Sequence, residues 1–132
     1  MTGQIVTQQG KTIVLNRTFK PTPDYTAPSV FAVGTGTTTP AAADTDLQTA
    51  ITIAGQPTKA IDSGYPVLTE ATLQGEIRCL VLTTECNSNT ITEFGLKNTD
   101  STKKLFSRAV FTGIAKTATV QLIITELDQI TI

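Results

Sequence analysis

The alternation of apolar and polar residues in the second half of the chain limits the fold more than any other feature of the sequence. Between Gly75 and Glu85, the side chains of Ile77, Cys79 and Val81 fall on one face of an extended strand. No window keeps the apolar period of about 3.6 residues that an amphipathic helix needs. Threonine, a β-branched residue that favours strands, makes up about a fifth of the chain. The sequence therefore predicts an all-β fold.

Short polar turns divide this pattern into several strands. The turn signal Asn87–Asn89 predicts that a strand over residues 75–85 and a strand over residues 90–96 form a hairpin. Further strands are expected at residues 29–33, 105–112 and 119–125. At 132 residues the chain has the length of one domain. A single antiparallel β-sandwich is the expected architecture.

The first 28 residues are predicted to form an N-terminal arm or hairpin, separate from a β-sandwich domain over residues 29–132. Two apolar segments, residues 4–7 and 11–15, flank Gln8–Gly10 and predict a hairpin. Three prolines between residues 21 and 28 favour an extended connector. This region either adds a strand to a neighbouring protein or supplies the first two strands of the sandwich itself.

Apolar residues near both ends of the chain are the candidate contacts with partners. Those of the arm exceed what a free tail should show, and the C-terminal end is a second, weaker candidate. The predicted interaction residues are Ile5, Val6, Ile13, Val14, Leu15, Tyr25, Ile130 and Ile132. Many copies acting together in an assembly allow each contact to be weak.

Charge and segment composition restrict the partners. Ten Lys and Arg residues against eleven Asp and Glu residues give a net charge of -1, so no excess of positive charge favours nucleic acid or an anionic membrane. No apolar run approaches the roughly 20 residues of a membrane span. The N-terminus lacks the basic and apolar regions of a signal peptide. We expect no nucleic acid or membrane partner, and assembly in the cytoplasm.

The missing residue types argue against an enzyme. The chain has no histidine, which excludes Ser-His-Asp and Cys-His mechanisms. Cys79 and Cys86 do not form a CxxC pair, and on one strand they would lie roughly 20 Å apart, beyond disulfide reach. They are expected to be free thiols. No catalytic residue, metal site or cofactor is predicted.

Two polar features have structural interpretations. Gly34 and Gly36 resemble a phosphate-binding loop, but neither a following Lys-Ser/Thr nor a third glycine completes such a motif. We expect a tight turn and a loop in which Asp44 or Asp46 caps a short turn. Glu93 and Arg108 lie in neighbouring predicted strands and are expected to form a cross-strand ion pair.

Four stretches of the chain resemble a known group of proteins. Residues 31–40 are FAVGTGTTTP, residues 44–47 are DTDL, residues 91–96 are ITEFGL, and residues 105–111 are LFSRAVF. In order and spacing they resemble segments that recur in virion proteins of tailed bacteriophages, especially tail-fibre and baseplate-associated proteins. Lys97 stands where that pattern more often has phenylalanine, so this strand end is expected to be exposed.

The resemblance implies a non-enzymatic structural subunit of a phage particle, located in the virion. Tail fibres are long and trimeric, whereas this chain stops at Ile132, which favours a tail or baseplate accessory protein or an adaptor. A capsid decoration (cement) protein is the alternative. A host-receptor or carbohydrate-binding module, with Tyr25 and Tyr65 as aromatic platforms, is the alternative from another class. The expected partners are other virion proteins and further copies of the chain, with a trimer as one option.

Overall fold

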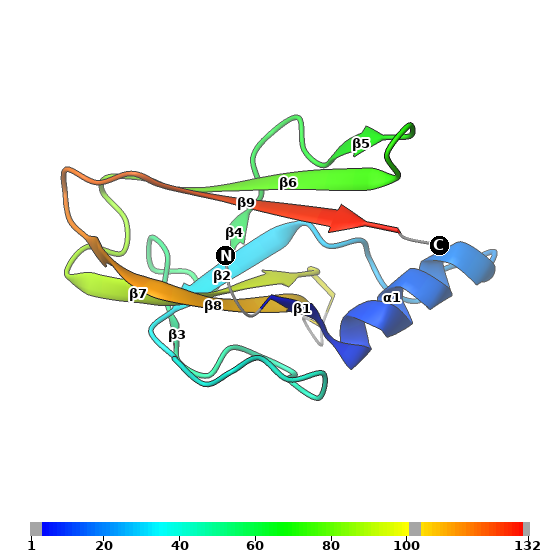
Figure 1. Cartoon of the computed structure of the whole chain (residues 1–132), viewed down its shortest axis with the longest axis horizontal. Coiled ribbons are helices and arrows are strands. Elements are labelled where there is room, and N and C mark those ends of the chain that lie inside the picture. The colour runs from blue at the N-terminus through cyan, green and yellow to red at the C-terminus, as the bar shows by residue number, and fades with distance from the viewer. Residues whose placement is uncertain (1–3, 101–103, 131–132) are drawn as a thin grey trace.

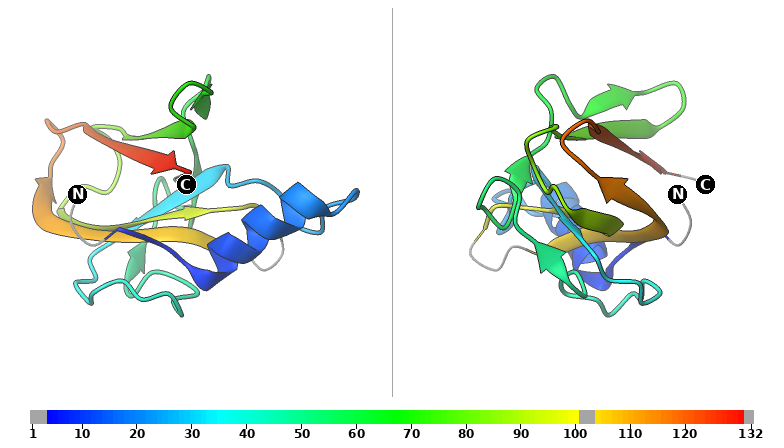
Figure 2. Two further views of the ribbon diagram at one scale, coloured as in Figure 1. Left: turned by 45° about the vertical axis from the view of Figure 1, so that its right-hand side comes forward. Right: turned by 90° about the vertical axis from the view of Figure 1, so that its left-hand side faces the viewer.

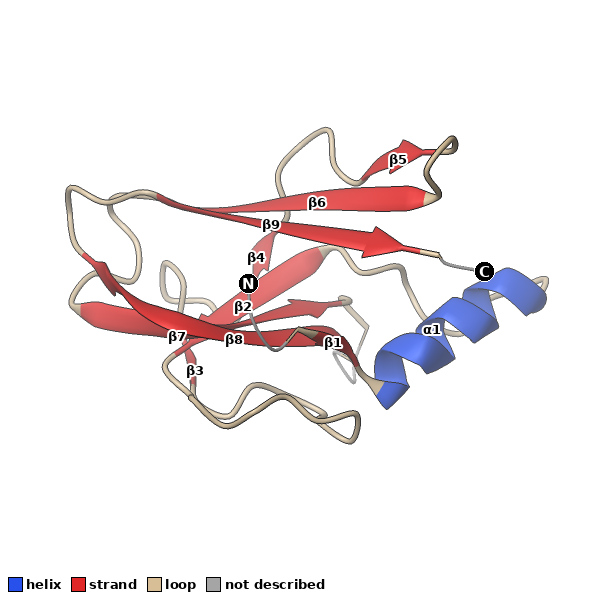
Figure 3. Cartoon of the chain, viewed as in Figure 1, coloured by secondary structure: helices blue, strands red, loops and turns tan. Residues whose placement is uncertain are grey.

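Two antiparallel β-sheets face each other, and one helix lies at an end of the larger sheet (Figure 1 and Figure 3). The structure, a computed structural model, describes residues 4–100 and 104–130. The predicted all-β, sandwich-like architecture is confirmed. Strand β2, at Val30–Gly34, and the proline-rich connector that precedes it lie where the sequence predicts them.

The larger sheet has the strand order β1-β8-β7-β2-β3, and β4 also pairs with β2. Its strands are β1 (Ile5–Val6), β2, β3 (Ala50–Ile51), β4 (Lys59–Ala60), β7 (Asn89–Lys97) and β8 (Leu105–Lys116). The smaller sheet has the order β5-β6-β9. Its strands are β5 (Val67–Thr69), β6 (Gln74–Val81) and β9 (Leu122–Gln129). Figure 2 shows the two sheets as separate layers in two further views.

The core lies between the two sheets and is built from the alternating residues of the long strands. Phe31 and Phe94 contact each other in it, with ring centroids 6.1 Å apart. The other buried members of the core are Val33, Ile53, Ile77, Cys79, Val81, Ile91, Leu96, Leu122 and Ile124. The predicted inward face of β6 is therefore confirmed, because its three alternating residues are all buried.

The predicted N-terminal hairpin is wrong, because residues 8–19 form helix α1 (Gln8–Phe19). Thr7 caps the helix: its hydroxyl accepts a hydrogen bond from the Gly10 N–H at 3.0 Å. The same hydroxyl donates to the Leu105 carbonyl of β8, so one side chain both starts the helix and ties it to the sheet. Capping and docking on β8 together outweigh the strand preference of the β-branched residues in this segment.

Gly10 is a packing residue and not the turn residue that the sequence suggested. A Cβ atom at this position would lie 2.1 Å from the Phe106 carbonyl oxygen of β8. Only a glycine lets α1 approach the strand this closely. Ile13, which is 1% exposed, is the other buried residue of the helix. The N-terminal segment is therefore joined to the sandwich through β1 and α1, both of which contact β8.

The predicted hairpin between residues 75–85 and 90–96 is also wrong. β6 pairs with β5 and β9, whereas β7 pairs with β2 and β8 in the other sheet. The loop between them crosses from one layer to the other, and the Glu85 carboxylate fixes it by accepting from the Leu82 N–H at 2.9 Å and from Lys59 Nζ at 2.8 Å. Each strand has a strongly apolar face, and these faces are buried most fully when they meet across the core.

Candidate functional site

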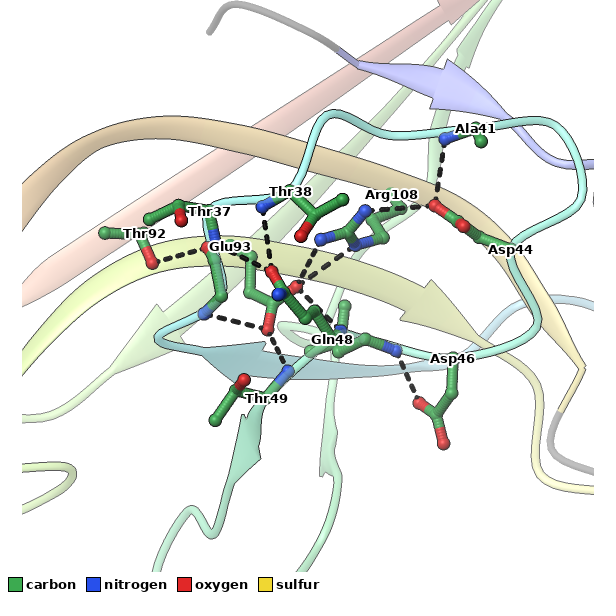
Figure 4. A network of polar contacts seen from close by, with 12 residues as sticks. Thr37, Thr38, Ala41, Asp44, Asp46, Gln48, Thr49, Thr92, Glu93 and Arg108 are labelled. Carbon is green, nitrogen blue, oxygen red and sulfur yellow. Dashed lines mark hydrogen bonds and ion pairs between the residues drawn. The ribbon is translucent and has the colours of Figure 1, made fainter.

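A loop of the larger sheet is held by a buried carboxylate (Figure 4). The side chain of Glu93, on β7, is 0% exposed, and it accepts hydrogen bonds from backbone N–H groups of the loop between β2 and β3. Its Oε1 accepts from Gly36 at 3.1 Å and from Thr49 at 2.7 Å, and its Oε2 accepts from Gln48 at 3.0 Å. Both ends of this loop are therefore attached to one side chain.

The glycines that resemble a phosphate-binding loop surround this carboxylate. A Cβ atom at Gly34 would lie 2.5 Å from Glu93 Oε1, and one at Gly36 would lie 2.6 Å from it. The absence of side chains at these two positions lets the backbone approach an anion, as in a phosphate loop. Here the anion is the protein's own glutamate, to which the Gly36 N–H already donates.

Arg108 neutralises the buried carboxylate, which confirms the predicted cross-strand ion pair. Its guanidinium, 2% exposed, donates to Glu93 Oε2 from Nε at 3.0 Å and from Nη2 at 2.8 Å. Nη1 donates to Asp44 at 3.0 Å, and Asp44 in turn accepts from the Ala41 N–H at 2.9 Å. The Asp44 carboxylate therefore closes the turn that begins at Ala41, whereas the Leu47 N–H donates to Asp46 Oδ1 at 2.8 Å. We call Asp44, Glu93 and Arg108 the loop clamp.

The expectation that Lys97 is exposed is wrong. Lys97 is 6% exposed, and its Nζ donates to Asp46 Oδ1 at 2.8 Å. A lysine is tolerated at this strand end because its ammonium meets a carboxylate from the loop next to the clamp. The polar side chains of this region therefore fix the loop in place and are engaged by the protein itself.

A groove opens at the end of the sandwich where helix α1 lies. It has a volume of about 450 Å³ and lies between the α1 and β8 side and the β5–β6–β9 sheet. Its large apolar lining residues are Val6, Val14, Leu68, Leu73, Phe106 and Ile130. We call this feature the end groove. Glu70 and Asp128 also line it, whereas the described lining residues include no Lys or Arg.

Strand β9 carries two carboxyl groups close together, Asp128, which lines the end groove, and Glu126, which is buried in the fold. The buried Glu126 receives hydrogen bonds from the Ser107 hydroxyl of β8 at 2.7 and 2.8 Å. Burial, and then the nearby Asp128 carboxylate, raise the pKa of Glu126 to about 8. Burial also raises the pKa of Asp128. At neutral pH, Glu126 is therefore mostly protonated and bridges the two sheets as a neutral group.

The structure separates the predicted interaction residues into three sets. Val6, Val14 and Ile130 line the end groove, and Leu15 is 58% exposed on α1 next to it. Ile13 is buried, and Ile5 is half-buried in β1. The other two predicted residues are placed elsewhere: Tyr25 lies in the connector, and Ile132 lies outside the described residues.

The residues of the groove that sequence reasoning missed come from short segments without a regular pattern. Leu68 lies within β5 and is 73% exposed, and Leu73 lies in the turn between β5 and β6 and is 48% exposed. Phe19, at the end of α1, is 76% exposed. The sequence signal that could have identified them is a large apolar residue beside polar turn residues, because a cluster of large apolar side chains is usually covered by a contact.

The remaining candidate groups are engaged within the fold. Lys104 Nζ lies 4.7 Å from the ring centroid of Tyr25, and the Arg78 guanidinium lies 5.5 Å from that of Tyr65. One face of each ring is thus covered by a cation. Cys79 and Cys86 are both free thiols, as expected, and burial raises the pKa of each.

The described part of the chain has neither a cluster of metal-binding side chains nor a membrane-spanning helix. Within residues 4–100 and 104–130, no three Cys, Asp or Glu side chains gather in a group that could bind a metal ion. In the same residues, no helix has the length and apolar character needed to cross a bilayer. Comparison with protein families, with characterised proteins and with solved structures finds no match to this chain.

Proposed function

We propose that this chain is a non-enzymatic structural subunit of a tailed-phage particle, which joins or covers neighbouring virion proteins. A tail or baseplate accessory protein or an adaptor is the preferred assignment, with a capsid decoration protein as the alternative. The observation that carries the proposal is the apolar surface around the end groove. It supplies a contact area on one end of a small, weakly charged domain, in which 16% of the residues are charged.

The loop clamp supports the same proposal. Its charged groups bind each other and the backbone of a surface loop, so they hold a shape and do not face a substrate. A rigid loop on a rigid sheet suits a subunit that must present the same surface in every copy. The resemblance of residues 31–47 and 91–111 to phage virion segments covers this clamp, since Asp44, Glu93 and Arg108 all lie within it.

The host-receptor or carbohydrate-binding alternative has less support. Sugar sites commonly use the open face of an aromatic ring. Tyr25 and Tyr65, the two aromatic residues considered for this role, are each half-buried and each stacked with a cation. We therefore do not prefer this alternative.

Cosedimentation tests the proposal. Heads and tails of the phage that encodes the chain are purified separately from a strain in which its gene is deleted, and each is mixed with the purified chain. We expect one of the two fractions to carry the chain into the pellet at a saturable, fixed ratio. Recovery of the chain in the supernatant of both mixtures would contradict the proposal. The fraction that binds distinguishes a tail subunit from a decoration protein.

A further inference from the structure

Helix α1 presents an apolar row to solvent beside the end groove. Leu15 and Phe19 are four residues apart and therefore lie on the same side of the helix, and they are 58% and 76% exposed. Val14, next to them, is 46% exposed and forms part of the groove wall. Through Val14, the exposed apolar residues of the helix adjoin the groove. Figure 1 shows α1 at this end of the molecule.

The two parts of this surface carry opposite charges. Lys11 lies four residues before Leu15 in the same row of the helix, and α1 contains Lys11 and Arg17 but no acidic residue. The groove has Glu70 and Asp128 among its described lining residues, and no Lys or Arg. A helix with the charge and apolar row of α1 therefore complements the groove in both respects.

Leu73 shows an unusual backbone at the same place. Its φ angle is +55°, in the left-handed region that a leucine rarely adopts, and its half-exposed side chain lines the groove. The fold thus keeps a leucine in an unfavourable conformation, where the free molecule leaves much of its apolar side chain in water. A contact that covers this side chain would account for its presence.

We propose that two copies of the chain pair through this surface, with Leu15 and Phe19 of each copy inserted in the end groove of the other. Because Val14 belongs both to the helix face and to the groove wall, seating one helix in a groove brings the second helix to the first groove. The contact is therefore reciprocal and has two-fold symmetry. Lys11 of each copy then lies at the acidic lining of its partner, near Glu70.

A charge exchange tests this pairing with the full-length chain. The variants Lys11→Glu and Glu70→Lys both change exposed residues, so each should keep the fold. Sedimentation equilibrium at low ionic strength should show a dimer for the wild type. Each variant alone should have a dissociation constant at least about tenfold higher, because like charges then meet in both contacts. An equimolar mixture should recover the wild-type constant, since one contact is native and the other has exchanged charges.

An apolar pair of variants tests the groove itself. Leu68→Asp places a charge in the groove at a residue that is 73% exposed, and it should weaken pairing about thirtyfold. Leu127→Asp is the matched control, because Leu127 is 52% exposed on β9 of the same sheet and does not line the groove. It should leave the dissociation constant unchanged. Thermal melting of both variants checks that they fold.

Three results would overturn the pairing. They are a wild-type chain that stays monomeric or forms a trimer, variants that pair as well as the wild type, and a mixture that does not recover the dimer. This inference is independent of the proposed phage function. A dimer that binds neither heads nor tails would refute the function alone, and a monomer that binds one of them would refute the pairing alone.

Discussion

At the scale of single residues, the buried ion pair of the loop clamp is where we expect a substitution to lower stability most. Replacing Arg108 with methionine would leave the Glu93 carboxylate buried without its guanidinium partner. We expect Arg108→Met to lower the free energy of unfolding by about 3–5 kcal/mol, measured by urea denaturation. The matched control is Arg78→Met, because Arg78 pairs with Asp62 at 2.6 Å but is 44% exposed. Its effect on the free energy of unfolding should be much smaller, because solvent screens this exposed pair. Equal effects for the two variants would contradict the buried clamp.

Glu126 predicts a pH dependence of stability. The folded chain keeps the proton of Glu126 up to about pH 8, whereas the unfolded chain loses it near the ordinary pKa of 4.5. Raising the pH between these values therefore weakens the fold, by up to about 1.4 kcal/mol per pH unit. Urea denaturation of Glu126→Gln between pH 5 and pH 8.5 should remove this loss, because a neutral amide can still accept from Ser107.

The exposed Thr12 provides the control for this experiment. Thr12→Ala leaves the Glu126 carboxyl group in place, so it should keep the pH dependence of the wild type. A wild-type stability that rises from pH 5 to pH 8 would contradict a buried, protonated Glu126.

The Glu93–Arg108 pair could be predicted from neighbouring strands, but the raised pKa of Glu126 could not. The raised pKa depends on the pairing of β9 with β6 in the smaller sheet, which buries the Glu126 carboxyl group.

At the scale of elements, helix α1 is tested by its only glycine. Alanine favours an isolated helix over glycine by about 1 kcal/mol. Gly10→Ala should nevertheless lower the melting temperature, because the new Cβ would lie 2.1 Å from the Phe106 carbonyl oxygen. Thr12→Ala changes an exposed residue of the same helix and should have a much smaller effect. A Gly10→Ala variant that melts higher than the wild type would show that α1 does not pack on β8.

The same element shows why part of the fold escaped prediction. Alternation identified β2 and the inward face of β6, because those strands bury one face along their whole length. Helix α1 buries mainly Gly10 and Ile13, so its sequence lacks a helical apolar period. Strands β6 and β7 were misassigned to one hairpin because a polar turn looks the same whether the chain folds back within a sheet or crosses between sheets.

At the scale of the whole molecule, the sandwich has a clamped loop on its larger sheet and an apolar contact surface at its α1 end. The sequence indicated that contact residues lie near both termini, and Val6, Val14 and Ile130 do line the end groove. The other wall comes from Leu68 and Leu73, which only the folded chain brings there. Together these features support the proposal that the chain acts by contact with neighbouring proteins.

The copy number of the chain in purified particles tests this account most directly. Under the proposed function a phage encodes the chain. Particles of that phage would be purified on a density gradient, washed at high salt and analysed by quantitative mass spectrometry against the major capsid protein. The account predicts a fixed ratio, reproduced between preparations and retained after the wash, as for a built-in subunit. Absence of the chain from the particles, or a ratio that falls to zero on washing, would contradict it.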